Sequence, residues 1–92
     1  MIVSFRSKAL KRFWEKSDGR LLNPKHLIKI ELILDALNLV YSIEGLITIG
    51  SDLHKLTGFT PPRWSVHVNG NWCVTFSFED GEAFAVDYED YH

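Results

Sequence analysis

Two glycine-containing turns divide residues 64–92 into three runs that alternate apolar and polar side chains. The turns are Asn69-Gly70 and Asp80-Gly81, and both dipeptides favour a β-hairpin. The even-numbered side of the runs carries Trp64, Val66, Val68, Trp72, Val74, Phe76, Phe78, Phe84, Val86 and Tyr88. The odd-numbered side carries Ser65, His67, Cys73, Thr75, Ser77, Ala83, Ala85 and Asp87. This pattern predicts a three-stranded antiparallel meander with one core face and one polar or open face.

The length of each hairpin loop decides whether the two faces stay intact, because a slip of one residue turns every side chain over. A two-residue loop at Asn69-Gly70 places Val66 opposite Cys73 and mixes the faces. The sequence therefore predicts three-residue loops at 69–71 and 79–81, with glycine bulges. The expected pairs are Val66 with Val74, Val68 with Trp72, Phe76 with Phe84 and Trp72 with Tyr88.

Two helices are expected before the meander. The first has Leu10, Phe13 and Trp14 at helical spacing, a cap at Ser4 or Ser7, and an end near residue 16, before Ser17-Asp18-Gly19. The second begins at Asn23-Pro24, with asparagine as cap and proline at the first helical position, and runs to about residue 40. Its apolar stripe consists of Leu27, Ile28, Ile30, Ile33, Leu34 and Leu37.

The remaining segments complete the expected fold. Residues 1–5 and 52–56 are predicted to be short strands, residues 42–46 a helical turn, and Pro61-Pro62 part of a loop, since proline removes a ladder donor. The chain is therefore expected to be one α+β domain, residues 1–92, with two layers. Its antiparallel β-sheet, made of a short N-terminal strand and the C-terminal meander, is covered on one face by two helices.

The amino-acid composition indicates the cellular compartment. The single cysteine, Cys73, excludes an intrachain disulfide and is typical of a reducing compartment. The opening MIVSFRSK lacks the apolar segment of a signal peptide, and no run reaches the length that crosses a membrane. We therefore expect a cytoplasmic protein with no membrane partner.

Charge is divided unevenly along the chain. Residues 1–30 hold eight Lys and Arg against two acids, a formal charge of +6, and residues 31–92 hold two against ten, a formal charge of −8. The basic residues of 1–30 could bind phosphate groups. The simpler interpretation is that they form the solvated surface of a helix.

Four segments resemble the HigB-type toxins of the RelE superfamily. They are IVSFRSKALKRFWEK at 2–16, LHKLTG at 53–58, WSVHVNGNW at 64–72 and VDYEDYH at 86–92. The resemblance covers essentially the whole chain, and the terminal DYEDYH is its most specific part.

The resemblance implies a toxin of a type II toxin–antitoxin system, a ribosome-dependent endoribonuclease of messenger RNA. Its chemistry uses the 2′-hydroxyl of the RNA as nucleophile, with no metal ion and no other cofactor. The implied partners are a helix-turn-helix antitoxin of the HigA type, the ribosome and messenger RNA, with operator DNA reached through the antitoxin. The positions that match the family's catalytic residues are His54, Asp90, Tyr91 and His92, and the RNA-binding candidates are Lys55, Arg63, Asn71 and Cys73.

Two departures from the family pattern bear on activity. The family usually reads Asn-Trp-Arg where this chain reads Asn71-Trp72-Cys73, and the lysine of its LHPLKG segment is Thr57 here. The arginine is expected to face the scissile phosphate, and loss of one such donor commonly costs about 10²–10³ in rate. Lys55 or Arg63 would replace the missing cations in part.

Several alternatives stay open at this point. His54 also fits a partly buried structural histidine, Asp90 a solvated charge, and Tyr91 a core aromatic. Cys73 with His54, His67 and His92 is a weak candidate for a metal or nucleophile site, because one cysteine with scattered histidines is a poor signal. The leading hypothesis is an active nuclease with His54 or His92 in proton transfer and Asp90 orienting one of them. The alternatives are a weakened homologue that keeps antitoxin binding and, more remotely, a small ligand-binding domain.

Overall fold

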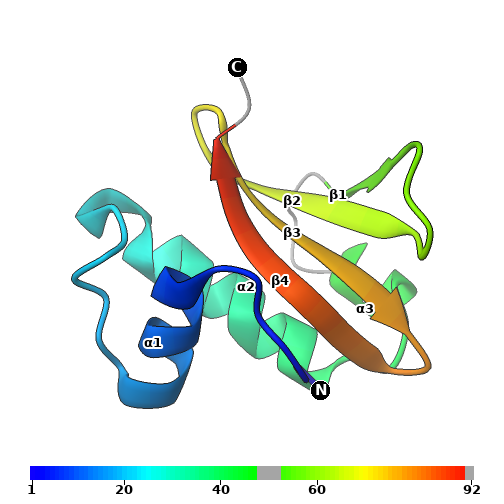
Figure 1. Ribbon diagram of the computed structural model, residues 1–92, viewed down its shortest axis with the longest axis horizontal. Helices are drawn as coiled ribbons and strands as arrows, with labels where there is room; N and C mark the ends of the chain where they lie inside the picture. The colour runs from blue at the N-terminus through cyan, green and yellow to red at the C-terminus, as the bar shows by residue number, and fades with distance from the viewer. Residues whose placement is uncertain (48–52, 91–92) are drawn as a thin grey trace.

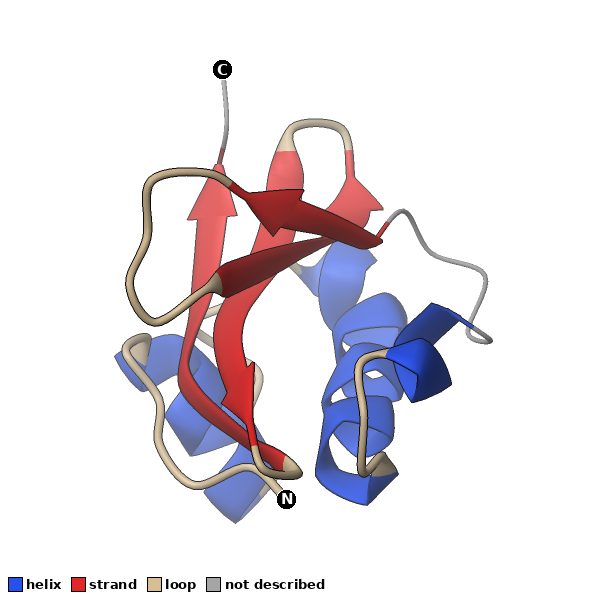
Figure 2. Cartoon of the chain, turned by 90° about the vertical axis from the view of Figure 1, so that its right-hand side faces the viewer, coloured by secondary structure: helices blue, strands red, loops and turns tan. Residues whose placement is uncertain are grey.

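The computed structural model of the chain describes residues 1–47 and 53–90. Its elements are α1 (Lys8–Lys16), the 3₁₀ turn η1 (Pro24–His26), α2 (Leu27–Leu39), α3 (Glu44–Ile47), β1 (Leu53–Leu56), β2 (Arg63–Asn69), β3 (Trp72–Glu79) and β4 (Glu82–Asp90). The four strands form one antiparallel sheet in the order β1-β2-β3-β4. Helix α2 lies along one face of this sheet, and α1 lies beside it (Figures 1 and 2). The expected two-layer α+β fold is confirmed. Asp52, expected at the start of the strand 52–56, lies outside the described residues.

The helix boundaries follow the capping signals. The Ser7 side chain accepts a hydrogen bond from the Leu10 amide, and Ser17 ends α1 in the left-handed region. Asn23 caps η1 through its side chain, which accepts from the Lys25 amide. The expected stripe of α2 is correct for Ile30, Ile33, Leu34 and Leu37, which are fully buried. It is wrong for Ile28, which is 80% exposed.

The N-terminal segment differs from the continuous strand that was expected. Two isolated bridges, Ile2 to Ala83 and Phe5 to Val86, join it to β4 in parallel orientation. The Val3 amide donates to the Ala83 carbonyl at 2.8 Å, and the Arg6 amide donates to the Val86 carbonyl at 2.8 Å. The chain start therefore covers the outer edge of β4 and satisfies part of its backbone.

Both hairpin loops contain two residues, so the expected three-residue loops are wrong. Asn69 pairs with Trp72 around Gly70-Asn71, and Glu79 pairs with Glu82 around Asp80-Gly81. Asp80 (φ 51°) and Gly81 (φ 77°) are both left-handed, as a tight primed turn requires. The expected pairs Val68 with Trp72, Phe76 with Phe84 and Trp72 with Tyr88 are absent from the register.

A β-bulge behind each turn restores the separation of faces. Between β2 and β3 the register shifts across Val68, so that Val66 pairs with Val74 as expected. Between β3 and β4 it shifts across Ala85, so that Val74 pairs with Tyr88. The first bulge adds to β2 the residue that a three-residue loop would have added. The second adds its residue to β4 rather than β3, so that the faces are kept but Trp72 pairs with Asp90, two positions beyond the expected Tyr88. The two tight turns and two bulges therefore give the expected faces for most of the meander.

The tip of the second hairpin is the exception. Ahead of the bulge, Phe78 pairs with Ala83 and Ser77 pairs with Phe84. Ala83 is fully buried and Phe84 is only half-buried, so the expected orientations of these two residues are reversed. The core, which joins the sheet to α1 and α2, includes Leu10, Leu34, Leu37, Val66, Val74, Phe76 and Val86.

Ala85 is held with a φ of 51°, a conformation that costs a non-glycine residue about 1 kcal/mol. We predict that Ala85→Gly raises the free energy of unfolding by about 1 kcal/mol, because glycine adopts this backbone without steric cost. Urea denaturation followed by tryptophan fluorescence measures the change.

Ala83→Gly is the matched control, since Ala83 lies in ordinary strand backbone of β4. This variant should lose about 1 kcal/mol through backbone entropy. Equal destabilisation by both substitutions would contradict the strain assigned to Ala85.

Candidate functional site

The face of the sheet turned away from α2 carries rows of polar side chains. Residues paired across strands share a face, and the register places His54, Ser65, Thr75 and Asp87 in one row. The neighbouring row contains His67, Cys73 and Glu89. We call these seven residues, together with Arg63 and Ser77, the polar face. It contains the odd-numbered residues of the expected meander except Ala83 and Ala85, and adds His54, Arg63 and Glu89.

Arg63 is the buried centre of the polar face, with 4% of its surface exposed. Its Nη1 donates to the Ser77 hydroxyl at 3.3 Å, and its Nη2 donates to the Thr75 hydroxyl at 3.1 Å and to the Ala85 carbonyl at 2.9 Å. Thr75 in turn donates its hydroxyl hydrogen to the carboxylate of Glu89. Arg63 was expected to contact RNA, and such a contact would require it to leave these internal acceptors.

The end of β4 brings a second group of residues together. Asp90 pairs with Trp72, and Asn71 directly precedes Trp72 in the β2–β3 loop. This loop lies beside the end of β4 (Figure 1). Asn71 and Asp90 are both exposed. Two of the predicted site residues therefore share one end of the sheet, while Tyr91 and His92 lie outside the described residues.

His54 is not at that end of β4. Strands β2 and β3 lie between it and β4, and its row meets β4 at Asp87. Asp90 alternates with Glu89, so its side chain points to the side of Trp72 and Tyr88 rather than to the polar face. A single substrate reaching both His54 and Asp90 must therefore extend across the polar face to the strand end, as a polynucleotide can.

Lys55 lies on the other side of β1 from His54. Its Nζ is 6.0 Å from the centre of the Trp64 ring, within reach of a cation–π contact, and its cross-strand partner is Trp64. Cys73 on the polar face has His67 and Glu89 as cross-strand partners. Where the family pattern has arginine, this chain thus places a thiol beside a carboxylate.

Beneath the strand end, Trp72 and Tyr88 stack with ring centroids 4.4 Å apart. Tyr88 also contacts His26, whose Nδ1 lies 2.6 Å from the Tyr88 hydroxyl oxygen. Burial raises the pKa of Tyr88 above its ordinary value, and the charge of Asp90 adds to this effect. A backbone hydrogen bond from Asn23 acts in the opposite direction on the same pKa.

His26 was not predicted from the sequence. It follows Asn23-Pro24, where the sequence gives a helix start and no reason to expect a buried imidazole facing the sheet. The burial of Arg63 was also missed, although the small hydroxyl residues Ser65, Thr75 and Ser77 on its side of the sheet are compatible with a large neighbouring side chain.

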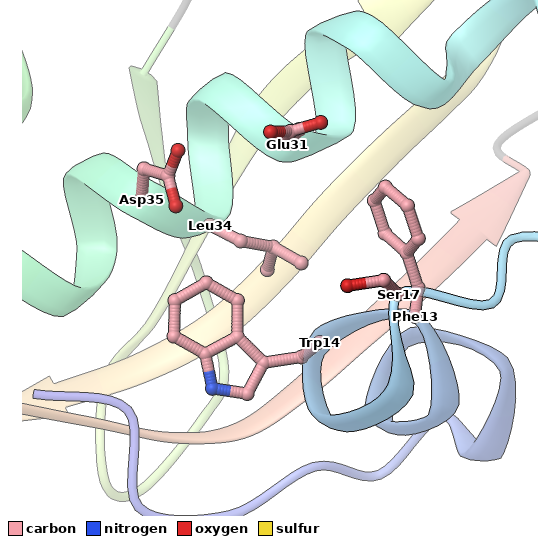
Figure 3. A pocket seen from close by; sticks show the side chains of 6 residues that line it. All are labelled: Phe13, Trp14, Ser17, Glu31, Leu34 and Asp35. Atoms are coloured by element: carbon pink, nitrogen blue, oxygen red, sulfur yellow. The ribbon is translucent and has the colours of Figure 1, made fainter.

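Two further observations concern the rest of the surface. A groove of about 300 Å³ between α1 and α2 is lined by Phe13, Trp14, Ser17, Glu31, Leu34 and Asp35, and contains none of the expected site residues (Figure 3). Within residues 1–47 and 53–90, no three His, Cys, Asp or Glu side chains are grouped to hold a metal ion, and no helix is long and apolar enough to cross a membrane.

Comparison with known proteins gives two matches of full or nearly full length. A family model described as "RelE-like toxin of type II toxin-antitoxin system HigB" matches residues 3–92. The chain is also 36% identical over 92 residues to a protein of Proteus vulgaris named "Endoribonuclease HigB", a match that covers 100% of both chains.

Proposed function

The chain belongs to the HigB-like family of RelE-like toxins of type II toxin–antitoxin systems, and from this premise we propose that it cleaves messenger RNA on the ribosome. The observation that carries the proposal is the identity of 36% to an endoribonuclease over the whole of both chains. The proposed place of action is the cytoplasm, where ribosomes translate. The proposed site runs from His54 across the polar face to the end of β4.

The proposed reaction is an attack by the 2′-hydroxyl of the RNA on the adjacent phosphate. The bond from O2′ to phosphorus forms, the bond from phosphorus to O5′ breaks, and the products carry a 2′,3′-cyclic phosphate and a 5′-hydroxyl. A base must accept the proton of O2′ and an acid must protonate O5′. His54 and His92 are the proposed proton carriers, with Asp90 orienting one of them, and no metal takes part.

RNA binding requires cations as well as proton carriers. Tyr91 and Asn71 are proposed to hold the RNA, and Lys55 to supply one cation at the β1 edge. The basic residues of α1 provide a separate surface for ribosomal RNA, since Lys8, Lys11, Arg12 and Lys16 surround one shallow groove. Arg63 supports the site from within, through Thr75 and Glu89.

Cleavage of a message bound to programmed ribosomes tests this proposal. We predict cleavage by the parent chain only when the message is on the ribosome, with 5′-hydroxyl ends that need phosphorylation before ligation. His54→Ala should lower the rate by roughly 10²–10³, in the range of general acid–base catalysis. His67→Ala, which removes the other histidine of the polar face but no proposed proton carrier, is the comparison variant and should lower the rate less than His54→Ala.

Ends carrying a 5′-phosphate would contradict attack by the 2′-hydroxyl. Equal cleavage of free RNA would contradict the dependence on the ribosome.

A second candidate function is favoured by the surroundings of Cys73. A phosphate beside Cys73 would meet the Glu89 carboxylate, and residue 73 offers it a thiol instead of a guanidinium. The Arg63 guanidinium is hydrogen-bonded to Ser77 and to the Ala85 carbonyl inside the sheet. The second candidate is therefore a catalytically weakened toxin that acts by binding the antitoxin. It would leave the message intact in the cleavage assay while still forming a stable complex with the antitoxin.

An antitoxin partner is implied by the family, and we propose that it is a helix-turn-helix protein of the HigA type that links the toxin to operator DNA. Helix α2 supports a protein partner on its outer face, where Ile28, Leu32 and Leu39 are 80%, 61% and 74% exposed. Glu31 and Asp35 border this apolar row on the groove between α1 and α2 (Figure 3). The complementary segment of the antitoxin would be amphipathic, with basic residues beside its apolar row.

We predict that the double variant Ile28→Ser, Leu32→Ser weakens binding of the antitoxin encoded beside this chain by at least about 10-fold, since two aliphatic side chains lose burial. Isothermal titration calorimetry measures the affinity. Val3→Ser, which changes an exposed aliphatic residue of the N-terminal segment rather than of α2, is the control and should bind normally. Parental affinity of the double variant would exclude this face as the docking site.

A further inference from the structure

A buried imidazole connects the start of α2 to the last strand. His26 is 4% exposed and is the last residue of η1, and its Nδ1 is 2.6 Å from the hydroxyl oxygen of Tyr88 on β4. Its ring centroid is 6.1 Å from those of both Tyr88 and Trp72. The three rings form one packed group, which we call the His26 cluster.

The short hydrogen bond joins two side chains that can each donate or accept. The Tyr88 hydroxyl donates in the tautomer of His26 whose Nδ1 carries no hydrogen, and it accepts in the other tautomer. In either tautomer the bond joins the start of α2 to β4. His26 in turn donates its backbone N–H to the Asn23 carbonyl at 2.9 Å. The turn before α2 and the Tyr88 hydroxyl thus fix each other.

The His26 cluster lies directly beneath the proposed site. Trp72 is the cross-strand partner of Asp90, and Tyr88 precedes Asp90 by two residues on the same side of β4. Asp90 therefore lies next to the stacked rings of Trp72 and Tyr88, on the same side of the sheet. Movement of Tyr88 therefore displaces the backbone that carries Asp90.

We propose that His26 and Tyr88 are positioning residues, which hold the end of β4 in the geometry that RNA cleavage needs. This inference rests on the proposed function, because it assigns the cluster to the same site. Neither residue touches the RNA. A displacement of about 1 Å at reacting groups can lower a rate by about 10²-fold, so a rigid support has a measurable effect.

A purely structural role is the alternative. A buried polar pair must be desolvated, and apolar side chains of similar volume often stabilise a core at least as well. The hydrogen bond does, however, fix one orientation of the Tyr88 ring, which an apolar pair would leave to packing alone. The two roles differ in what they predict for the catalytic rate at equal stability.

The experiment compares kcat, KM and Tm of Tyr88→Phe with those of the parent chain, using a message on programmed ribosomes. Tyr88→Phe keeps the ring stacked on Trp72 and removes only the hydroxyl. We expect kcat to fall about 10-fold and KM to change by less than twofold. His26→Phe should give a similar loss, and the double variant should lose no more than either single variant, because the pair acts as one unit.

Ile33→Val is the matched control for stability, since Ile33 is fully buried on α2 and is not part of the His26 cluster. It should lower Tm while kcat stays at the parental value. A parental kcat in Tyr88→Phe would overturn the positioning role. So would a fall in kcat that is as large in Ile33→Val as in Tyr88→Phe for the same fall in Tm.

Amide hydrogen exchange separates failure of this inference from failure of the proposed function. If the parent chain cleaves no message, the proposed function fails, and the inference is decided by the exchange of residues 88–90. Tyr88→Phe should then speed exchange there at least 10-fold and leave residues 82–84 unchanged. Equal exchange of both segments in parent and variant would overturn the inference.

Discussion

The left-handed backbone of Ala85 is the constraint on which the arrangement of the last strand depends. Its carbonyl accepts from Arg63 at 2.9 Å, and its amide donates to the Ser4 hydroxyl at 2.9 Å. These two contacts hold a bulge that an alanine would not adopt by preference. Because the bulge adds one residue to β4, Asp87 and Glu89 point to the polar face, and Tyr88 and Asp90 point to the other side.

Arg63 thereby links the fold to the candidate site. Its guanidinium contacts the Ala85 carbonyl on one side and Thr75 and Ser77 on the other, and Thr75 contacts Glu89. The single arginine of the sheet's described residues is thus committed to structure, while Cys73 stands beside Glu89. If RNA binds this face, the cations that it needs must come from outside it: from Lys55 on the other side of β1, from the basic helix α1 or from the ribosome complex.

Much of the fold could be predicted because capping residues and hydrophobic period act locally. Ser7, Asn23 and Pro24 mark helix starts, and the alternation in residues 64–78 marks a two-faced sheet. The loop lengths could not be predicted, because a two-residue turn with a bulge and a three-residue loop give the same alternation. The orientations of Ala83 and Phe84 were predicted wrongly for this reason, because these two residues lie between the turn and the bulge.

The candidate site was predictable only in part. Resemblance to the toxin family pointed to His54 and Asp90, and pairing of the strands shows that two strands lie between them. No local signal identified His26, because its partner Tyr88 lies 62 residues away in the sequence. The burial of Arg63 was not predictable for the same reason, because its hydrogen-bond acceptors lie on other strands. The residue types indicate which groups can react, and the pairing register of the strands decides which of these groups lie close together.

Growth of a bacterial host after induction of this chain tests the central claim most directly, with His54→Ala and Cys73→Arg induced in parallel. We predict that the parent slows growth, that His54→Ala does not, and that Cys73→Arg arrests growth most strongly, because arginine restores a phosphate contact on the polar face. Normal growth with all three chains soluble and in the absence of antitoxin would contradict the assignment of an RNA-cleaving toxin.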